Sequence, residues 1–123
     1  MKKICIITGA NAGIGKAATL QMAQQGYQVI MACRDGKRAK KALREIHQTS
    51  PSVDMMVVDM SLQSSIKAFA KEVIQGFAHI DVLIHNAAAF DISQKQAIYT
   101  AENIESIWAT NHVGPVCLTQ ELL

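Results

Sequence analysis

Three glycines lie close together near the start of the chain, within the segment Thr8 to Gly15 (TGANAGIG). Gly9 suits a tight turn, Gly13 leaves no Cβ between the backbone and a ligand, and Gly15 lets a helix press close to a strand. Such a loop points free backbone N–H groups and the positive end of a helix dipole at one spot, which favours a diphosphate. The alternative is an ordinary glycine-rich turn. It is disfavoured because a strand pattern precedes the segment and a helix pattern follows it.

A second group of residues follows the next apolar run, in the order Cys33-Arg34-Asp35. An arginine at the end of this strand can pair with the 2′-phosphate of NADP through two parallel hydrogen bonds. Asp35 lies about twenty residues beyond Gly15, where a carboxylate would bind the 2′-hydroxyl of NAD instead. Asp35 also suits the N-cap of the following helix. We therefore expect NADP, with NAD the less favoured cofactor.

Apolar periodicity predicts the elements that must position these residues. Short β-branched or apolar runs predict four strands, at Ile4–Thr8, Gln28–Cys33, Val53–Asp59 and Asp81–Asn86. Helical spacing predicts four helices between and after them. The first is Gly13–Gln25, with Ile14, Ala18 and Met22 on its inner face, and the second is Lys37–Gln48, with Ala39, Leu43 and Ile46 on its inner face. The third runs from an N-cap at Ser61 to Gly76, with Ile66, Phe69 and Val73 facing inward, and the last is capped by Thr100 and carries Ile104, Ile107, Trp108, Asn111 and Leu118.

The alternation of strand and helix predicts βαβ units with right-handed crossovers and a parallel sheet. The fold class is therefore α/β, a doubly wound parallel sheet of the Rossmann kind. The 123 residues suit one domain, and no linker or internal repeat divides them. Gly26 follows the first helix, where a C-terminal glycine is expected, and Pro51 follows the second helix and prevents its continuation.

Charge and composition exclude several classes of partner. Twelve Lys and Arg against ten Asp and Glu leave a net charge of +2, with no excess to hold nucleic acid or an anionic membrane. No apolar run approaches the ~20 residues that cross a bilayer. Three widely spaced cysteines favour a reduced, cytoplasmic protein without disulfides. The four histidines show no metal-ligand spacing with the cysteines, so no metal site is expected.

Five short motifs, taken in order, resemble those of the short-chain dehydrogenase/reductase family. TGANAGIG resembles the TGxxxGxG pattern of that family, and the others are ACRD around Arg34, VVDMSL around Asp59, HNAA at the end of the fourth strand and ATNHVGP in the last helix. The resemblance covers essentially the whole chain, but family subunits are about twice as long. It implies the N-terminal, cofactor-binding half of such a subunit, truncated after the fourth strand and the following helix.

The resemblance also implies roles for individual residues. Asp59 would meet the adenine amino group with Met60 beside the ring, and Asn86 would stabilise the fourth strand and line the cofactor cleft with Ala87. Asn111 would be the catalytic asparagine that supports a proton-relay water. The full set of implied cofactor-binding residues is Thr8, Gly9, Asn11, Gly13, Ile14, Gly15, Arg34, Asp59, Met60, Asn86 and Ala87.

Two of these residues have simpler interpretations. Asp59 also suits a turn that begins the next helix, and Asn111 also suits the exposed side of a helix. Pro115 favours the functional interpretation of Asn111, because proline cannot donate to the carbonyl four residues earlier. We therefore expect a local kink between Asn111 and Pro115, where a free carbonyl can hold a water.

The acid/base of the family, a tyrosine followed four residues later by a lysine, is absent. The only tyrosines, Tyr27 and Tyr99, are followed at that spacing by Met31 and Asn103. The expected function is an NADP-dependent oxidoreductase for a small apolar carbonyl or alcohol, inactive as this portion alone. The alternative is a non-catalytic dinucleotide-binding or assembly module. An unpaired fourth strand and the last helix predict a homo-oligomer.

Overall fold

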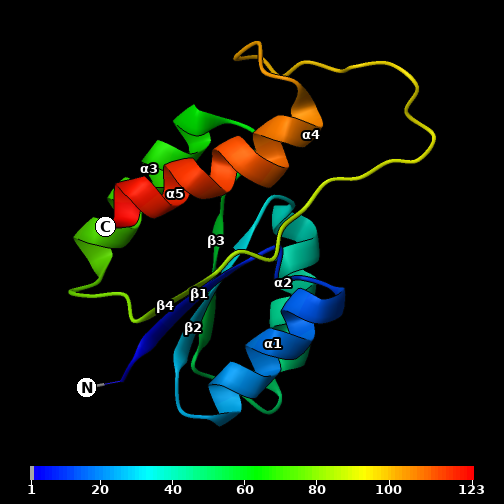
Figure 1. The fold of residues 1–123 in the computed structure, drawn as a ribbon. Coiled ribbons are helices and arrows are strands. Elements are labelled where there is room, and N and C mark those ends of the chain that lie inside the picture. Colours follow the sequence, from blue (N-terminus) through cyan, green and yellow to red (C-terminus); the bar gives the residue numbers. More distant parts are fainter. Residues whose placement is uncertain (1) are drawn as a thin grey trace.

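The computed structural model describes residues 2–123 (Figure 1). Strands and helices alternate along most of the chain, in the order β1 (Ile4–Thr8), α1 (Gly13–Gln24), β2 (Gln28–Cys33), α2 (Gly36–His47), β3 (Val53–Val57), α3 (Gln63–Gly76), β4 (Val82–Ile84), α4 (Ser106–Trp108), the π-helical segment η1 (Ala109–Val113) and α5 (Gly114–Leu122). The predicted strand-helix alternation is confirmed, and the element bounds differ from the expected ones by a few residues.

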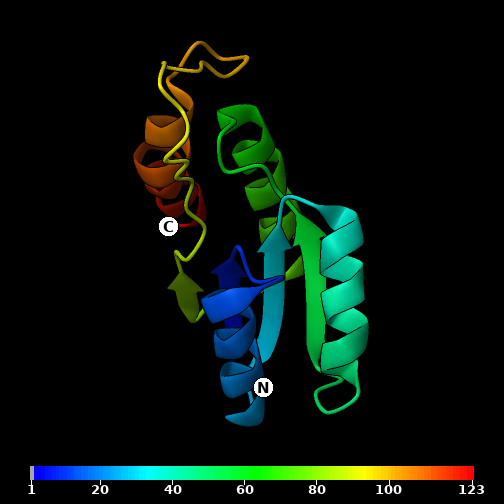
Figure 2. The ribbon, with the colours of Figure 1, turned by 90° about the vertical axis from the view of Figure 1, so that its right-hand side faces the viewer.

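The four strands form one parallel sheet in the order β3-β2-β1-β4. The chain therefore starts in the sheet interior at β1, moves outward to β3 and then crosses to the other side of β1. Figures 1 and 2 show α1 and α2 on one face of the sheet and α3 and α5 on the other. This is the expected doubly wound α/β arrangement, with the β1–α1 turn at the carboxyl edge of the sheet.

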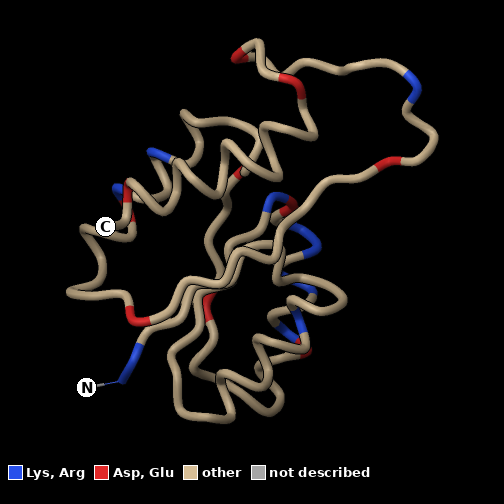
Figure 3. The backbone as a smooth tube through the Cα atoms, viewed as in Figure 1, with Lys and Arg blue, Asp and Glu red and all other residues tan. Residues whose placement is uncertain are grey.

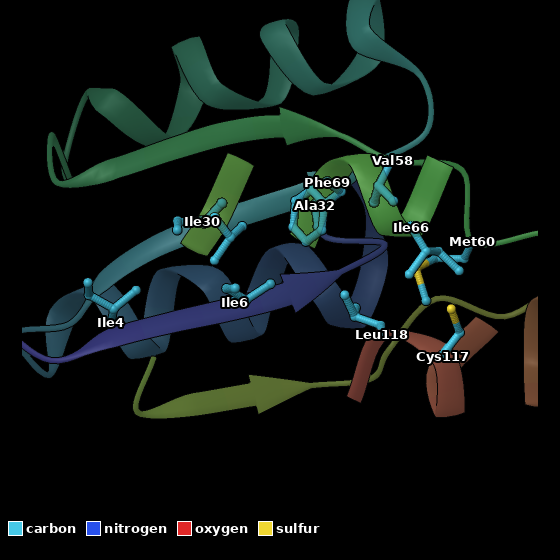
Figure 4. Packing of buried hydrophobic residues seen from close by; sticks show 11 residues of the cluster. Ile4, Ile6, Ile30, Ala32, Val58, Met60, Ile66, Phe69, Cys117 and Leu118 are labelled. Carbon is cyan, nitrogen blue, oxygen red and sulfur yellow. The ribbon is translucent and has the colours of Figure 1, made fainter. Parts of the chain in front are cut away.

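Side chains of β1 and β2 alternate between two apolar cores. Ile4, Ile6 and Ile30 face α3 and α5 and pack with their residues, including Phe69 and Leu118 (Figure 4). The intervening residues of the same strands face α1 and α2: Cys5, Ile7, Val29, Met31 and Cys33. Both faces are thus covered, which explains why these strands are apolar at every position except Thr8 and Gln28. Burying each large aliphatic side chain contributes roughly 1.5–3 kcal/mol.

The inner face expected for α1 is partly wrong. Ile14 is 82% exposed, while Gly15 and Thr19 are the buried residues of this helix. In the first turn of α1 it is Gly15 that packs against the loop after β1 and Asn86, which leaves the neighbouring Ile14 side chain in solvent. Thr19 is compatible with burial because its hydroxyl donates to the carbonyl oxygen of Gly15 at 2.9 Å. Ala18 and Met22 do pack, partly buried, against the core.

Two of the expected helix caps are also wrong. Leu62, not Ser61, precedes α3, and its side chain offers no cap. The first amides of α3 are bound instead by the distant Glu102, whose carboxylate accepts from the N–H groups of Gln63 at 2.6 Å and Ser64 at 3.0 Å. The last helix begins at Ser106 rather than near Thr100, and Glu105 caps it. Asp35 caps α2, as expected.

Between β4 and α4 the chain runs as a long connection that arcs away from the sheet (Figure 1). It carries four strongly exposed large apolar or aromatic residues: Phe90, Ile92, Ile98 and Tyr99. The connection ends at a turn in which the amide of Ser106 donates to the carbonyl of Ile98 at 2.7 Å. Among residues 2–123, no helix has both the length and the apolar character that a bilayer crossing requires.

Candidate functional site

The glycine loop after β1 adopts the backbone that its residues suggested. Gly9 and Gly13 have φ angles of +63° and +55°, in the left-handed region that favours glycine. A Cβ on Gly9 would lie 2.9 Å from the Cα of Ala87, and a Cβ on Gly15 would collide with the carbonyl oxygen of Gly9. These two glycines therefore permit the close approach of the loop, α1 and the end of β4.

The start of α1 offers backbone amides without a competing side chain. Its N-cap is Ala12, which makes no side-chain hydrogen bond, and its first turn holds no acidic residue. A Cβ on Gly13 would meet nothing within 4 Å, so this position opens onto free space. An open, uncapped helix N-terminus beside a left-handed glycine fits the size and charge of a diphosphate.

Thr8 and Asn86 hold this loop against β4. The Thr8 hydroxyl oxygen accepts from the backbone amides of Asn86 and Ala87, both at 3.0 Å. The Asn86 side-chain nitrogen donates to the carbonyl of Gly9, also at 3.0 Å. Thr8, Gly15 and Asn86 thus lie behind the cradle and shape it, rather than lining the cleft in front of it.

In front of the loop lies a cleft of about 740 Å³ at the carboxyl edge of the sheet. Six of the expected cofactor-binding residues line it: Gly9, Asn11, Arg34, Asp59, Met60 and Ala87. Asp35, weighed in the sequence as the rival carboxylate, also lines it. Sequence reasoning missed two further polar lining residues, Arg38 and Thr110. Arg38 lies in the first turn of α2, whereas Arg34 precedes that helix, so no local spacing pointed to their shared place at the cleft. Gly13 and Ile14 lie at the exposed start of α1, outside this lining.

Four charged side chains gather at one end of the cleft, two basic and two acidic. The Arg34 Nε lies 3.8 Å from an Asp59 carboxylate oxygen, and the Arg38 Nε lies 3.6 Å from one of Asp35. Both arginine side chains are about four-fifths exposed (81% and 79%), so these contacts are weak and an anion can replace them. One oxygen of Asp35 accepts from the amides of Lys37 and Arg38 as the α2 cap.

Cys33 and Asp59 complete the surroundings of this charged end. Cys33 has no carboxylate to offer a ribose, and burial raises the pKa of its thiol, which favours the neutral form. Asp59 accepts hydrogen bonds from both the amide and the hydroxyl of Ser61, at 2.9 and 2.6 Å. Asp59 therefore builds the turn before α3, as the simpler interpretation had it, while it also lines the cleft.

Asn111 lies in η1, where the helix departs from α geometry as expected for this segment. The amide of Gly114 donates to the carbonyl of Ala109, five residues earlier. The Asn111 side chain makes a two-point contact with the backbone of Ala89: its nitrogen donates to the carbonyl at 2.8 Å, and its oxygen accepts from the amide at 2.7 Å. Asn111 therefore fixes the cleft wall at Ala89 to the distorted helix.

A comparison with family models identifies the chain. The model described as short chain dehydrogenase matches residues 3–123. The chain belongs to the short-chain dehydrogenase family. This result confirms the resemblance seen in the sequence motifs and the Rossmann fold that it implied. Nicotinamide dinucleotides are the cofactors of that family, and the described part of the chain holds no cluster of three metal-ligating side chains.

Several curated proteins are similar to this chain. Human retinol dehydrogenase 11 is 37% identical over 98% of the chain, and dehydrogenase/reductase SDR family member 13 of Bos taurus is 34% identical over 98%. Protochlorophyllide reductase of Marchantia paleacea is 35% identical over 99% of the chain. The chain spans only 38%, 31% and 27% of the lengths of these three relatives.

Solved structures support the fold. A metagenomic short-chain oxidoreductase in complex with NADP superposes with a TM-score of 0.85 at 25% identity, covering 98% of this chain and 54% of the other. A Mycobacterium paratuberculosis protein superposes with a TM-score of 0.79 at 32% identity, covering 98% of this chain and 41% of the other. The Rossmann fold of this chain is thus shared with solved proteins that are 25% and 32% identical to it in sequence.

Proposed function

We propose that residues 1–123 form the NADP-binding domain of an NADP-dependent oxidoreductase of the short-chain type. The observation that carries this proposal is a pair of exposed guanidinium groups, those of Arg34 and Arg38, in the cleft. The glycine loop lines the same cleft. The NADP complex of the metagenomic relative is in keeping with it.

The residues present fit the proposed cofactor part by part. The uncapped start of α1 at Gly13 would hold the diphosphate through backbone amides, without a side chain in the way. Asp59 and Met60 line the part of the cleft next to Arg34, where an adenine ring would lie. Ala87 and Thr110 line the cleft further along, toward η1, where the nicotinamide half would lie.

The preference for NADP over NAD follows from the charges beyond β2. Arg34 and Arg38 would bind the 2′-phosphate through charge-assisted hydrogen bonds. The rival carboxylate, Asp35, is already engaged with two amides of α2 and with Arg38, so it is poorly placed to accept from a ribose hydroxyl. Cys33 is neutral and offers no charged acceptor in its place.

The chemistry divides between the cofactor and the protein. A bound nicotinamide supplies or accepts the hydride. This chain's contribution is to bind and orient the nicotinamide. Asn111 stabilises the distorted helix beside Ala89 through its two hydrogen bonds to the Ala89 backbone. The sequence holds no tyrosine followed at four residues by lysine. Because no general acid/base is present to move the proton, we propose that these 123 residues bind cofactor without turnover.

Titration calorimetry with NADPH and NADH tests the cofactor assignment. We expect tighter binding of NADPH, and Arg34→Ala should weaken NADPH binding about 10- to 100-fold, since a hydrogen bond to a charged group contributes ~1.5–3 kcal/mol. NADH binding should barely change. Lys71→Ala on α3 removes the same charge far from the cleft and serves as the control. Equal or tighter binding of NADH by the unaltered chain would overturn the NADP assignment.

The proposed substrate of the longer enzyme is a small apolar carbonyl or alcohol. The name of retinol dehydrogenase 11, a relative at 37% identity, supports an apolar alcohol. Three free, buried cysteines, Cys5, Cys33 and Cys117, support a reducing, cytoplasmic location. Assays of an extended chain with NADPH and retinal, against a polar aldehyde of similar reactivity, would test the substrate class by the ratio of kcat/KM values.

A further inference from the structure

Helix α2 concentrates positive charge in a chain that is otherwise slightly acidic. It contains five of the twelve Lys and Arg residues and a single acidic residue, Glu45. Its formal charge is therefore +4, against +2 for the whole chain, which leaves −2 for all other residues together. Figure 3 shows these blue positions along α2, on the face of the sheet that α1 also covers.

Four of these side chains form one stripe, which we call the basic face of α2. Lys37, Lys40, Lys41 and Arg44 follow the i, i+3, i+4, i+7 spacing of a single helix face, and all four are exposed. The buried residues of α2 lie on the other side, at Ala39, Ala42 and Ile46. Within residues 2–123, none of the four makes an ion pair.

The basic face is unfavourable for the helix itself. Like charges three and four residues apart on a helix repel each other and lower its stability. The one carboxylate that could relieve this repulsion, Glu45, is paired with Lys16 of α1. The charges of Lys41 and Arg44 act on the Glu45 carboxylate, but more weakly than that of Lys16. A stripe that costs stability and makes no ion pair within residues 2–123 is more readily explained by an anionic partner outside the chain.

The position of the stripe indicates which anion. The N-terminal end of the stripe, at Lys37, lies next to Asp35 and Arg38, which line the cleft proposed for NADP. Helix α2 is about 18 Å long, so the stripe extends the positive potential of Arg34 and Arg38 away from the cleft and down the outside of the molecule. No exposed Phe, Tyr, Trp or large aliphatic side chain lies on α2 to stack on bases or enter a bilayer, and the one exposed ring, His47, bonds through Nε2 to the carbonyl of Val53.

We propose that the basic face of α2 steers the polyanionic cofactor toward the cleft, so that its role is in the association rate rather than in the bound complex. The proposal rests on the proposed function, because it takes NADP(H) as the ligand. Aligned charge of one sign beside a cleft raises the local concentration of an oppositely charged ligand and speeds its encounter. The four side chains need not touch the bound cofactor.

Stopped-flow measurement of NADPH binding tests this proposal. The triple variant Lys40→Gln/Lys41→Gln/Arg44→Gln should lower the association rate constant at least about threefold at roughly 0.01 M salt, where the Debye length is about 30 Å. The dissociation rate constant should not change, and the difference should vanish near 1 M salt. Glutamine has nearly the helix propensity of lysine and arginine, so the variant should fold, and its Tm should rise as the repulsion is removed.

The matched control is Lys3→Gln/Lys67→Gln/Lys71→Gln, which removes the same net charge from the start of the chain and from α3 on the other face of the sheet. We expect it to change the association rate much less than the α2 variant does. Equal slowing by both variants would show an effect of net charge alone and overturn the proposal. So would a change confined to the dissociation rate. Failure of NADPH to bind the unaltered chain would instead overturn the proposed function and the steering with it.

Discussion

Gly13 and Gly26 share a left-handed backbone, with φ angles of +55° and +94°, and neither has an atom within 4 Å of a built Cβ. They differ in place, since Gly13 starts α1 at the proposed diphosphate cradle and Gly26 follows its far end. The two positions therefore separate the cost of backbone strain from the cost of obstructing a ligand.

Substituting alanine at each glycine makes the comparison. Both Gly13→Ala and Gly26→Ala should lower the free energy of unfolding by about 1–2 kcal/mol, the cost of a left-handed L-residue. Only Gly13→Ala should also weaken NADPH binding, by about tenfold or more, because its methyl group would occupy the space of the diphosphate. Urea unfolding and calorimetric titration give the two readouts. An unchanged NADPH affinity in Gly13→Ala would contradict the cradle.

For individual residues, the sequence predicted those roles that follow from local chemistry. The glycine pattern located the loop and its close approaches, and Asp35 was correctly expected to cap α2. Ile14 failed because periodicity registers only that a residue is apolar, not that the neighbouring Gly15 is the residue of this turn that packs inward. Arg38 was missed because its place beside the cleft depends on how α2 packs, which no short motif encodes.

Among the elements, α5 closely approaches the turn between β3 and α3, at Met60. A Cβ on Gly114 would collide with the carbonyl oxygen of Met60, whereas one on Gly76, at the end of α3, would meet nothing within 4 Å. The first glycine is therefore required by tertiary packing and the second is not.

We expect Gly114→Ala to destabilise the chain by at least about 2 kcal/mol, because the backbone of η1 and α5 must shift away from Met60. Gly76→Ala should be neutral or stabilising by up to about 1 kcal/mol, since alanine is the better helix former. Thermal unfolding of both variants measures the difference. A Tm for Gly114→Ala within error of the unaltered chain would show that the contact is not required.

The start of α3 should be sensitive to acid. Hydrogen bonds from the amides of Ser64 and Gln63 hold the pKa of the Glu102 carboxyl below its ordinary value of 4.5. A lowered pKa in the folded state contributes stability above pH 4.5, and this contribution is lost as the pH falls through the folded-state pKa. Glu102→Gln should therefore lower Tm at pH 7, and the gap to the unaltered chain should narrow below pH 4.5.

The control for this prediction is Glu72→Gln. The Glu72 carboxylate is exposed on α3, and it makes no hydrogen bond or ion pair within residues 2–123. Its Tm should follow the unaltered chain at every pH. A gap for Glu102→Gln that stayed constant from pH 7 to pH 3 would contradict an ionised cap.

Element types were thus easier to predict than element ends. Strands and helices follow from apolar spacing over several residues, and all four strands were placed correctly to within a few positions. The cap expected at Ser61 was wrong because the first amide of α3 binds Glu102, which is placed by how the long connection returns to α3. The cap expected at Thr100 was wrong because α4 begins only at Ser106, where the adjacent Glu105 caps it. A side chain thirty-nine residues away leaves no local signal.

On the scale of the whole molecule, β4 forms one edge of the sheet and pairs only with β1. Exposed apolar side chains also lie on α5, at Val116, and in the long connection, at Phe90. Unpaired edges and apolar patches favour association. We therefore predict that the chain forms homo-oligomers, and that the mass measured by light scattering rises with concentration.

Val116→Asp should reduce this association if α5 takes part in the contact, because a carboxylate is costly to bury. Ile14→Asp, on the opposite side of the sheet, should leave it unchanged. A monomeric mass for the unaltered chain at all concentrations would contradict the prediction. The fold class itself was predictable because both faces of the sheet must be covered, whereas the state of its edge depends on contacts between chains.

The contact between Glu102 and the distant start of α3 has a consequence for folding during synthesis. While the ribosome makes this protein, the first turn of α3 emerges thirty-nine residues before the carboxylate that binds its amides. At roughly 5–20 residues per second, this interval is about 2–8 s. During that time the nascent helix has an unsatisfied end, so its final docking must wait for the segment that follows β4.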